Sequence, residues 1–308
     1  MLKEILLKSA IQYDDENYNF RNFVMEAPFT VGFKITEKCN FSCKHCIASS
    51  DMTGNIGLST EDCIRIIDNV RFSGTQKIEI TGGEPYLRKD IEEVLLHCKK
   101  VGLGVIVTTN GTLLKDGNID FLVLNDIFTQ ISIDGLEDTN DYLRGKGSFN
   151  MTINAIKKLV AKNARMRINF TVQKYNQNSL EKTVSYLSKL GVNDLNIIFA
   201  CPQGRAYNSM ENLLDVDEIR KVKTQTELVK KEYPNFDIKI VDHRLLSRSY
   251  VLIETNGDIV SQSHSEDDRI IVGSLLKESL KDLWKNSGKF DHVRHLLQYI
   301  RHPLIMNN

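Results

Sequence analysis

The feature that most constrains the fold of this 308-residue chain is a repeated alternation of strand and helix patterns. Short runs rich in β-branched and aromatic residues alternate with amphipathic segments that carry an apolar stripe. Strands are predicted at 29–36, 77–80, 103–111, 128–135, 166–172 and 192–200. Helices are predicted between and after them, at 58–70, 90–102, 115–124, 150–162 and 179–190. Because parallel strands need such crossover helices, the alternation predicts an α/β fold with a parallel sheet.

Six strand-helix units can close into a partial (β/α)6 barrel, and catalytic groups would then gather at the carboxyl ends of the strands. The turns richest in chemically active residues follow the predicted strands, and they read EKCNFSCKHC, TGGEP, TTNGT and SIDG. Since these turns come from separate segments, their agreement predicts one shared site at that end of the barrel.

The pattern changes after residue 204. A long amphipathic helix is followed by short strands, a TNGD hairpin turn at 255–258 and a helical end that starts near residue 279. We therefore predict an N-terminal extension at 1–28, a core barrel at 29–204 and a small C-terminal α+β appendix at 205–308. The appendix is expected to pack against the barrel mouth.

Charge and hydropathy limit the classes of binding partner and the cellular compartment that the sequence favours. The chain has 40 basic and 40 acidic residues, and this balance argues against a protein that grips nucleic acid over a wide surface. The apolar run at the N-terminus is broken by Lys3, Glu4 and Lys8, so it does not predict a signal peptide. No stretch approaches the roughly 18 apolar residues of a spanning helix. We expect a cytoplasmic protein without a membrane partner.

Three of the six cysteines, Cys39, Cys43 and Cys46, share one short loop. In a reducing compartment such cysteines are more often metal ligands than disulfides. A zinc site normally takes four ligands in two spaced pairs, and His45 is an awkward fourth because it adjoins Cys46. A [4Fe-4S] cluster fits better, since three thiolates bind three irons and leave one iron open. Zinc or a purely structural cluster remain the alternatives.

The spacing Cys39-x3-Cys43-x2-Cys46, just after the first predicted strand, resembles the radical S-adenosylmethionine superfamily over roughly residues 29–200. The resemblance implies that the open iron chelates S-adenosylmethionine, whose one-electron cleavage gives a 5′-deoxyadenosyl radical that abstracts hydrogen from a substrate. It also implies an electron donor such as flavodoxin or ferredoxin.

The same resemblance assigns cofactor contacts to further positions. In TGGEP, the carbonyls of Gly82 and Gly83 and the carboxyl group of Glu84 would receive the methionine ammonium. His45 would pack near adenine, and Arg144 would pair with the cofactor carboxylate. Contacts to ribose or methionine are expected from residues at the ends of the third and fourth strands: Thr109, Asn110, Ser132 and Asp134. Asn169, on the fifth strand, could point into the barrel near cofactor or substrate. Each residue also has an ordinary alternative role. The residues of the glycine turn and the strand ends could be plain turn residues, His45 a solvated histidine and Arg144 a surface arginine. Asn169 could lie on the solvent-facing side of a half-buried strand.

The remaining cysteines fall into two groups. Cys63 and Cys98 lie on the apolar stripes of predicted outer helices and are expected in the core. Cys201 follows the sixth predicted strand, so it should lie at the catalytic face. A thiol there could return a hydrogen atom to a substrate radical, although a cysteine that is merely nearby fits the pattern as well.

The tail around 250–286 resembles the start of the SPASM or twitch domain of peptide-modifying and sugar-modifying superfamily members. Those domains usually hold further clusters through cysteines, but no cysteine follows Cys201 here. Ser261, Ser263 and His264 stand where a ligand would be expected. We therefore predict no extra cysteine-bound cluster and a domain that acts as a lid and substrate platform.

Three functions are compatible with these patterns. The first is a radical enzyme that modifies a ribosomally synthesised peptide by epimerisation, crosslinking or other C–H chemistry, although residues 1–28 are too short for a leader-binding domain. The second is a radical enzyme for a small molecule such as a nucleotide or nucleotide sugar, similar to viperin-like dehydratases. The third is a metal-binding or sensor protein, which would leave the glycine turn and the polar strand ends unexplained.

Overall fold

The computed structural model describes residues 26–241, 250–262 and 269–290. Its parallel strands are β1 (Thr30–Lys34), β2 (Lys77–Thr81), β3 (Gly104–Thr109), β4 (Phe128–Ser132), β5 (Met166–Val172), β6 (Asp194–Phe199) and β7 (Asp237–Val241). The helices around them are α2 (Thr60–Phe72), α3 (Ile91–Lys100), α4 (Asp116–Leu124), α5 (Glu137–Arg144), α6 (Ser148–Ala161), α7 (Leu180–Lys189) and α8 (Val216–Glu232). Two short 3-10 helices, η2 (Pro85–Leu87) and η3 (Gly204–Asn212), follow β2 and β6.

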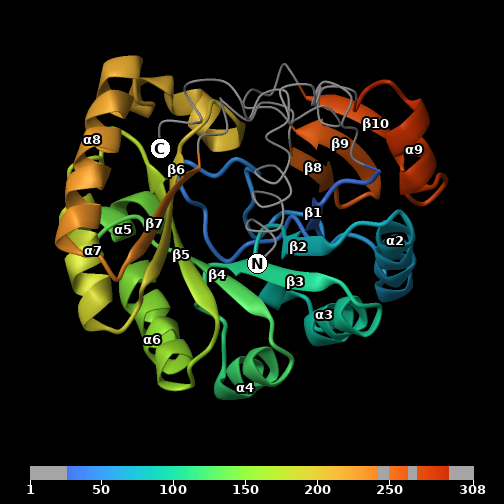
Figure 1. Ribbon diagram of the computed structural model, residues 1–308, viewed down its shortest axis with the longest axis horizontal. Helices are drawn as coiled ribbons and strands as arrows, with labels where there is room; N and C mark the ends of the chain where they lie inside the picture. The colour runs from blue at the N-terminus through green and yellow to red at the C-terminus, as the bar shows by residue number, and fades with distance from the viewer. Residues whose placement is uncertain (1–25, 242–249, 263–268, 291–308) are drawn as a thin grey trace, which may run out of the picture.

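These strands form one curved sheet with the helices outside it (Figure 1). The strand order is β10-β9-β8-β1-β2-β3-β4-β5-β6-β7, and β1 to β7 run parallel to their neighbours. The edge strands β7 and β10 stand at opposite ends of this order, so the sheet curves without closing. The prediction of an α/β partial barrel is confirmed.

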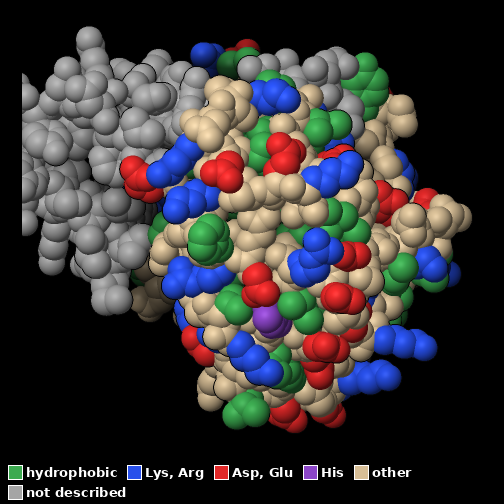
Figure 2. All heavy atoms as spheres, turned by 90° about the vertical axis from the view of Figure 1, so that its right-hand side faces the viewer, with side chains coloured by type: hydrophobic (Ala, Val, Ile, Leu, Met, Phe, Trp, Pro, Cys, Tyr) green, Lys and Arg blue, Asp and Glu red, His purple; other side chains and the backbone are tan. Residues whose placement is uncertain are grey.

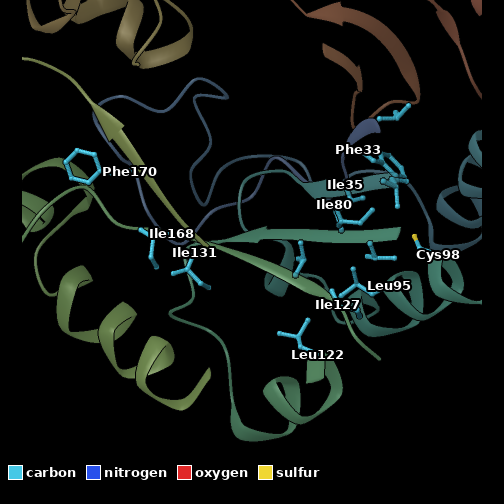
Figure 3. Packing of buried hydrophobic residues seen from close by; sticks show 14 of the residues in the cluster. Phe33, Ile35, Ile80, Leu95, Cys98, Leu122, Ile127, Ile131, Ile168 and Phe170 are labelled. Atoms are coloured by element: carbon cyan, nitrogen blue, oxygen red, sulfur yellow. The ribbon is translucent and has the colours of Figure 1, made fainter. Parts of the chain in front are cut away.

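Apolar side chains on the outer face of the sheet meet the apolar stripes of the helices (Figure 3). Phe33 of β1 and Ile80 of β2 are fully buried, as are Leu95 and Cys98 of α3. Strand residues alternate between the two faces, so every second residue of a strand reaches this layer. Cys63 is fully buried in the same cluster, which confirms the core assignment of Cys63 and Cys98.

A side-chain cap fixes the start of α2. Ser59 caps α2 by accepting a hydrogen bond from the backbone N–H of Asp62 at 3.1 Å. Helix α5 was not predicted, because the segment EDTNDYLR is short and mostly polar. It is nevertheless placed firmly, since Asn140 and Arg144 on it are buried. This unpredicted helix carries one of the expected site residues.

The tail extends the barrel sheet at its other edge. Strand β8 (Tyr250–Ile253) pairs in parallel with β1, and β9 (Asp258–Gln262) and β10 (Ile270–Ser274) follow antiparallel. The tail strands therefore continue the barrel sheet beyond β1. From the sequence we expected the tail to pack against the barrel mouth instead. The physical reason is that an unpaired edge of β1 would leave backbone groups without partners. The domain boundary at residue 204 stays a prediction.

Some expectations lie outside the described residues: most of the N-terminal extension, Ser263, His264 and the helical segment beyond residue 290. Ser261 is described and is fully buried in β9.

The outer surface carries both charge signs. On the face over α2, α3 and α9 (Leu280–Asn286), acidic and basic side chains are interspersed (Figure 2). This mixture agrees with the balanced composition of the whole chain. No helix in the described part of the chain combines the length and the apolar character needed to cross a bilayer.

Asn69 of α2 joins the tail to the barrel. Its Nδ2 donates to the carbonyl of Leu275 at 3.2 Å and to that of Glu278 at 2.8 Å. Its Oδ1 accepts a hydrogen bond from the backbone N–H of Leu280, the first residue of α9, at 2.9 Å. One amide side chain thus fixes three backbone groups of the segment between β10 and α9.

Replacement of Asn69 by alanine should lower the free energy of unfolding by about 2 kcal/mol, because three hydrogen bonds are lost together. Urea unfolding of the full chain measures the change. Arg65→Ala is the matched control on the same helix, since Arg65 is exposed and pairs with Asp62 across one turn. Equal losses in the two variants would show that Asn69 does not anchor the tail.

Candidate functional site

The cysteine loop, residues 35–58, connects β1 to α2 and carries the three predicted ligands. Cys43 is buried, Cys39 and Cys46 are half-buried, and all three thiols are free. The N–H of Cys39 donates to the carbonyl of Asp51 at 2.9 Å, and the N–H of Cys46 donates to that of Cys43 at 3.2 Å. The N–H of Phe41 points at the Sγ of Cys39 at 3.4 Å, a geometry that favours a thiolate there.

The electrostatics of these thiols suit a cationic group. Burial raises the pKa of the Cys39 thiol to about 11, and the negative charges of Glu84, Cys43 and Cys46 add to the increase. Burial also raises the pKa of Cys43, while the guanidinium groups of Arg144 and Arg205 oppose the increase. Positive iron ions would stabilise the thiolates against this mutual repulsion.

The donor set fits an iron–sulfur cluster. The three thiols are free and lie within eight residues of one loop. Among the described residues, no three His, Cys, Asp or Glu side chains converge on a point that would hold a single metal ion. A cluster needs no such convergence, because each thiolate binds a different iron. Cys39, Cys43 and Cys46 are the residues that would hold it.

The glycine turn after β2 lies directly against the cysteine loop. The N–H of Gly83 donates to the carbonyl of Thr36 at 2.7 Å, and the N–H of Glu84 donates to that of Lys38 at 2.7 Å. A Cβ atom on Gly83 would lie 2.1 Å from the carbonyl oxygen of Lys38. Gly82 also has a φ of +152°, which favours glycine. The glycines therefore permit a close backbone contact between the turn after β2 and the cysteine loop. Their predicted contact with the methionine ammonium is a separate role.

Glu84 forms the centre of the contacts behind this turn. Its carboxyl group is fully buried. It accepts hydrogen bonds from Tyr86 N at 3.0 Å, Thr109 Oγ1 at 2.7 Å and Asn110 N at 2.8 Å. Burial raises the pKa of the Glu84 carboxyl, and these three hydrogen bonds oppose that increase. The side chain joins the ends of β2 and β3, and its contact with the methionine ammonium stays a prediction.

The end of β3 also holds the cysteine loop. Asn110 Nδ2 donates to the Oδ1 of Asn40 at 2.8 Å, and Asn40 Nδ2 donates to the Oγ1 of Thr112 at 2.9 Å. Asn40 directly follows Cys39, so the end of β3 holds the side chain next to the first ligand. The structure therefore brings Thr109 and Asn110 to the site, where they support the loop. Their contacts with a cofactor stay predictions.

A buried ion cluster lies at the end of β4. Asp134 is fully buried, and its Oδ2 is 2.6 Å from the Nε of Arg144 and 3.1 Å from the Nε2 of His45. Its Oδ1 accepts a hydrogen bond from the N–H of Thr171 at 2.8 Å. Although burial acts to raise it, Arg144 and His45 hold the pKa of Asp134 well below its usual range. The structure thus brings His45, Asp134 and Arg144 into contact with one another. Their contacts with a cofactor stay predictions.

A row of polar side chains crosses the inner face of the sheet. The Nδ2 of Asn196 donates to Asn169 Oδ1 at 3.1 Å and lies 3.4 Å from Gln130 Oε1. On the other side of the row, Thr108 Oγ1 donates to Glu79 Oε1 at 2.7 Å, and the amide of Gln130 reaches the same oxygen at 3.3 Å. Asn169 lies in this row, and Ser132 is its register partner on β4. The barrel interior can therefore bind polar groups.

Cys201 lies two residues beyond the end of β6 and is buried. Its Sγ is 3.5 Å from the carbonyl oxygen of Phe199. The structure thus places this thiol at the predicted end of the barrel, and its role as hydrogen donor stays a prediction.

Arg205 was not among the site residues predicted from the sequence. This residue follows the predicted end of the barrel, yet its side chain binds the cysteine loop more than 150 residues earlier in the chain. The one signal in the sequence for such a role was the pair Gly204-Arg205 after a strand end. Such pairs are too common to predict a contact with the cysteine loop.

An open pocket of about 290 Å³ lies beside the cysteine loop. Tyr142 and Tyr175 stack at 3.9 Å between ring centroids, and the Nζ of Lys44 lies 3.4 Å from the Tyr142 centroid. Gln173 and Arg205 also line the pocket. Aromatic faces, amides and cations together can hold an extended polar chain.

Replacement of Gly83 by alanine should displace the cysteine loop, because the added Cβ would overlap the carbonyl of Lys38. We expect a loss of about 2 kcal/mol in unfolding free energy and lower iron binding after anaerobic reconstitution. Gly117→Ala on α4 is the control, since nothing lies within 4 Å of its Cβ position. That variant should be about 0.5 kcal/mol more stable. Normal iron binding and stability in Gly83→Ala would contradict the packing argument.

Comparison with known proteins agrees with this geometry. The radical SAM superfamily model matches residues 33–187, which are 155 of the 308 residues. Mycofactocin maturase MftC of Mycobacterium tuberculosis (strain ATCC 25618 / H37Rv) is 27% identical over 289 residues, which cover 88% of this chain and 73% of MftC. The sporulation killing factor maturation protein SkfB of Bacillus subtilis (strain 168) is 31% identical over 200 residues, which cover 64% of this chain and 48% of SkfB.

Among solved structures, that of Streptococcus suis SuiB bound to the precursor peptide SuiA has a TM-score of 0.77. The match covers 95% of this chain and 78% of SuiB at 16% sequence identity, so it shows a shared fold.

Proposed function

Because this chain belongs to the radical SAM superfamily, we propose that its substrate is a ribosomally synthesised peptide, modified by epimerisation, crosslinking or other C–H chemistry. Members of the family are enzymes that use a [4Fe-4S] cluster and S-adenosylmethionine. When bound, these two groups supply a one-electron cleavage whose product radical takes hydrogen from the substrate. The observation that carries the assignment is the loop of three free thiols fixed at the strand ends of a partial barrel.

The residues of the chain prepare this site before any cofactor binds. The N–H of Glu84 binds the carbonyl of Lys38, and the side chain of Asn110 binds that of Asn40, so both neighbours of Cys39 are held. Asp134 orients His45 beside Cys46. The Nδ1 of His45 is buried and has no hydrogen-bond partner in the described structure, so it remains available for a bound group. Burial of Cys43 and His45 also limits access of water to reactive species there.

The peptide substrate is supported by the relatives and by the pocket. MftC and SkfB are named as maturation proteins, and SuiB was crystallised with a precursor peptide. The pocket with the stacked Tyr142 and Tyr175 opens beside the cysteine loop, where a peptide could lie close to the cluster. We propose that this pocket contacts the peptide.

The chemistry of the cluster also bears on the cellular compartment of the enzyme and on its electron donor. A cluster that must be reduced in every catalytic cycle, or reduced once before repeated turnover, needs a reducing compartment and an electron donor. We therefore propose a cytoplasmic enzyme that receives electrons from a flavodoxin or ferredoxin.

The substrate class is tested by anaerobic turnover of the reconstituted enzyme with reductant, S-adenosylmethionine and host extract separated by size. The macromolecular fraction should increase 5′-deoxyadenosine formation, and protease treatment of that fraction should remove the increase. Cys43→Ala, which lacks one thiolate ligand, should form none. Stimulation by the small-molecule fraction alone would favour a nucleotide or nucleotide sugar instead. No 5′-deoxyadenosine from enzyme with a full cluster would refute radical chemistry.

We propose Cys201 as the hydrogen donor if the reaction is an epimerisation. Its S–H hydrogen atom would pass to the substrate radical, and the thiyl radical left on Cys201 would then regain one electron from the proposed electron donor and one proton from solvent. In deuterium oxide the wild-type enzyme should place one solvent deuterium in each product, because thiol hydrogens exchange with solvent. Cys201→Ala should still form 5′-deoxyadenosine but should yield little epimerised product. Cys98→Ala, which removes a fully buried thiol from α3, is the control and should keep the deuterium label. Unchanged deuterium incorporation in Cys201→Ala, measured by mass spectrometry, would exclude this role.

A further inference from the structure

Arg205 binds three carbonyl groups of the cysteine loop. Its backbone N–H donates to the carbonyl of Cys46 at 2.9 Å. Its Nε donates to the carbonyl of Cys43 at 2.7 Å, and its Nη2 donates to that of Ser50 at 2.7 Å. Two of these three carbonyls belong to residues that would ligate the cluster. A segment at the end of β6 therefore fixes the backbone of the ligand loop.

The preceding glycine makes this contact possible. Gly204 has a φ of +53°, in the left-handed region that favours glycine. A Cβ atom there would lie 2.4 Å from the carbonyl oxygen of Cys46 and 2.5 Å from that of Ile47. The start of η3 thus lies directly on the loop, and any larger residue at position 204 would push the two segments apart.

The loop provides few hydrogen bonds of its own to these carbonyls. The N–H of Cys46 reaches the carbonyl of Cys43 at 3.2 Å, and the N–H of Ser49 reaches that of Cys46 at 3.3 Å. Both contacts are longer than those made by Arg205. A guanidinium group suits the task because its fixed fork binds two carbonyls at once, which a lysine ammonium on a flexible stem does not.

The charge of Arg205 matters as well as its geometry. A guanidinium group stays protonated at all ordinary pH values. Net charge and hydrogen bonding around an iron–sulfur cluster set its reduction potential. A permanent positive charge next to Cys43 favours the reduced form, which carries one more negative charge.

We propose that Arg205 is a positioning residue for the cluster, which holds the backbone of Cys43 and Cys46 and makes the bound cluster easier to reduce. The inference rests on the cluster chemistry of the proposed function and does not depend on the identity of the substrate. It also assigns a role in the cluster site to the first residue beyond the predicted barrel.

The test compares Arg205→Gln and Arg205→Lys with wild type, using the full chain. Arg220→Gln on α8 is the control, because its side chain is 74% exposed and pairs with Asp217. Iron and sulfide per chain are measured after anaerobic reconstitution, and cluster loss to a chelator is followed with time. The midpoint potential is determined by titration with electron paramagnetic resonance detection. Urea unfolding of the cluster-free proteins reports on general folding.

Arg205→Gln should lose its cluster about ten times faster or more. Its midpoint potential should shift to more negative values, because the charge is gone. Arg205→Lys should keep a potential near that of wild type but lose its cluster at an intermediate rate. Arg220→Gln should match wild type in every measurement.

Wild-type cluster retention and potential in Arg205→Gln would overturn the proposal. So would a loss of cluster that is fully matched by unfolding of the cluster-free protein, since that would show a general structural role. If Arg205→Gln does not fold, Arg205→Lys decides the matter, and wild-type retention in that variant would overturn the positioning role. A wild-type protein that binds no cluster at all would instead refute the proposed function.

Discussion

The backbone of the cysteine loop must be held by other parts of the chain, and much of the site depends on this need. From residue 35 to residue 58 the loop forms no helix and no strand, apart from one bridge between Lys38 and Asp51. Only some of its N–H and carbonyl groups pair within the loop, so the others need partners from elsewhere. The turns after β2 and β6 supply some of them through the N–H of Glu84 and through Arg205, while Asn110 after β3 binds the side chain of Asn40 in the loop. The parallel sheet makes this possible because it brings separate strand ends to one place.

Two buried carboxyl groups organise these strand ends. Burial of a carboxylate is costly unless hydrogen bonds or opposite charges compensate for it. Glu84 is compensated by three hydrogen bonds, and Asp134 by Arg144, His45 and a backbone N–H. A cofactor carboxylate that bound Arg144 would compete with Asp134 for the same guanidinium. The ion cluster would then have to rearrange, because removal of one partner from a buried pair is costly.

The sequence predicted the strands, most of the helices and the position of the site, because these features repeat with a clear period or follow a strand end. It did not predict α5, which is only eight residues long and mostly polar in composition. It also did not predict that Arg205 contacts the cysteine loop, since a residue pattern contains no record of contacts between distant segments. The placement of Glu84 shows the same limit. Its spacing from the cysteines was informative, but its full burial depends on how β2 and β3 pack.

The tail is connected to the site as well as to the sheet. Thr255, in the turn between β8 and β9, donates to the Oε1 of Glu37 at 3.0 Å, and Glu37 Oε2 lies 3.4 Å from the N–H of Asn55. Glu37 lies two residues before Cys39, so the tail reaches the start of the ligand loop while Arg205 holds its later part. Both contacts come from beyond residue 204. The barrel core therefore does not fix the cluster loop by itself, and a substrate that moved the tail or η3 would also change the surroundings of the cluster.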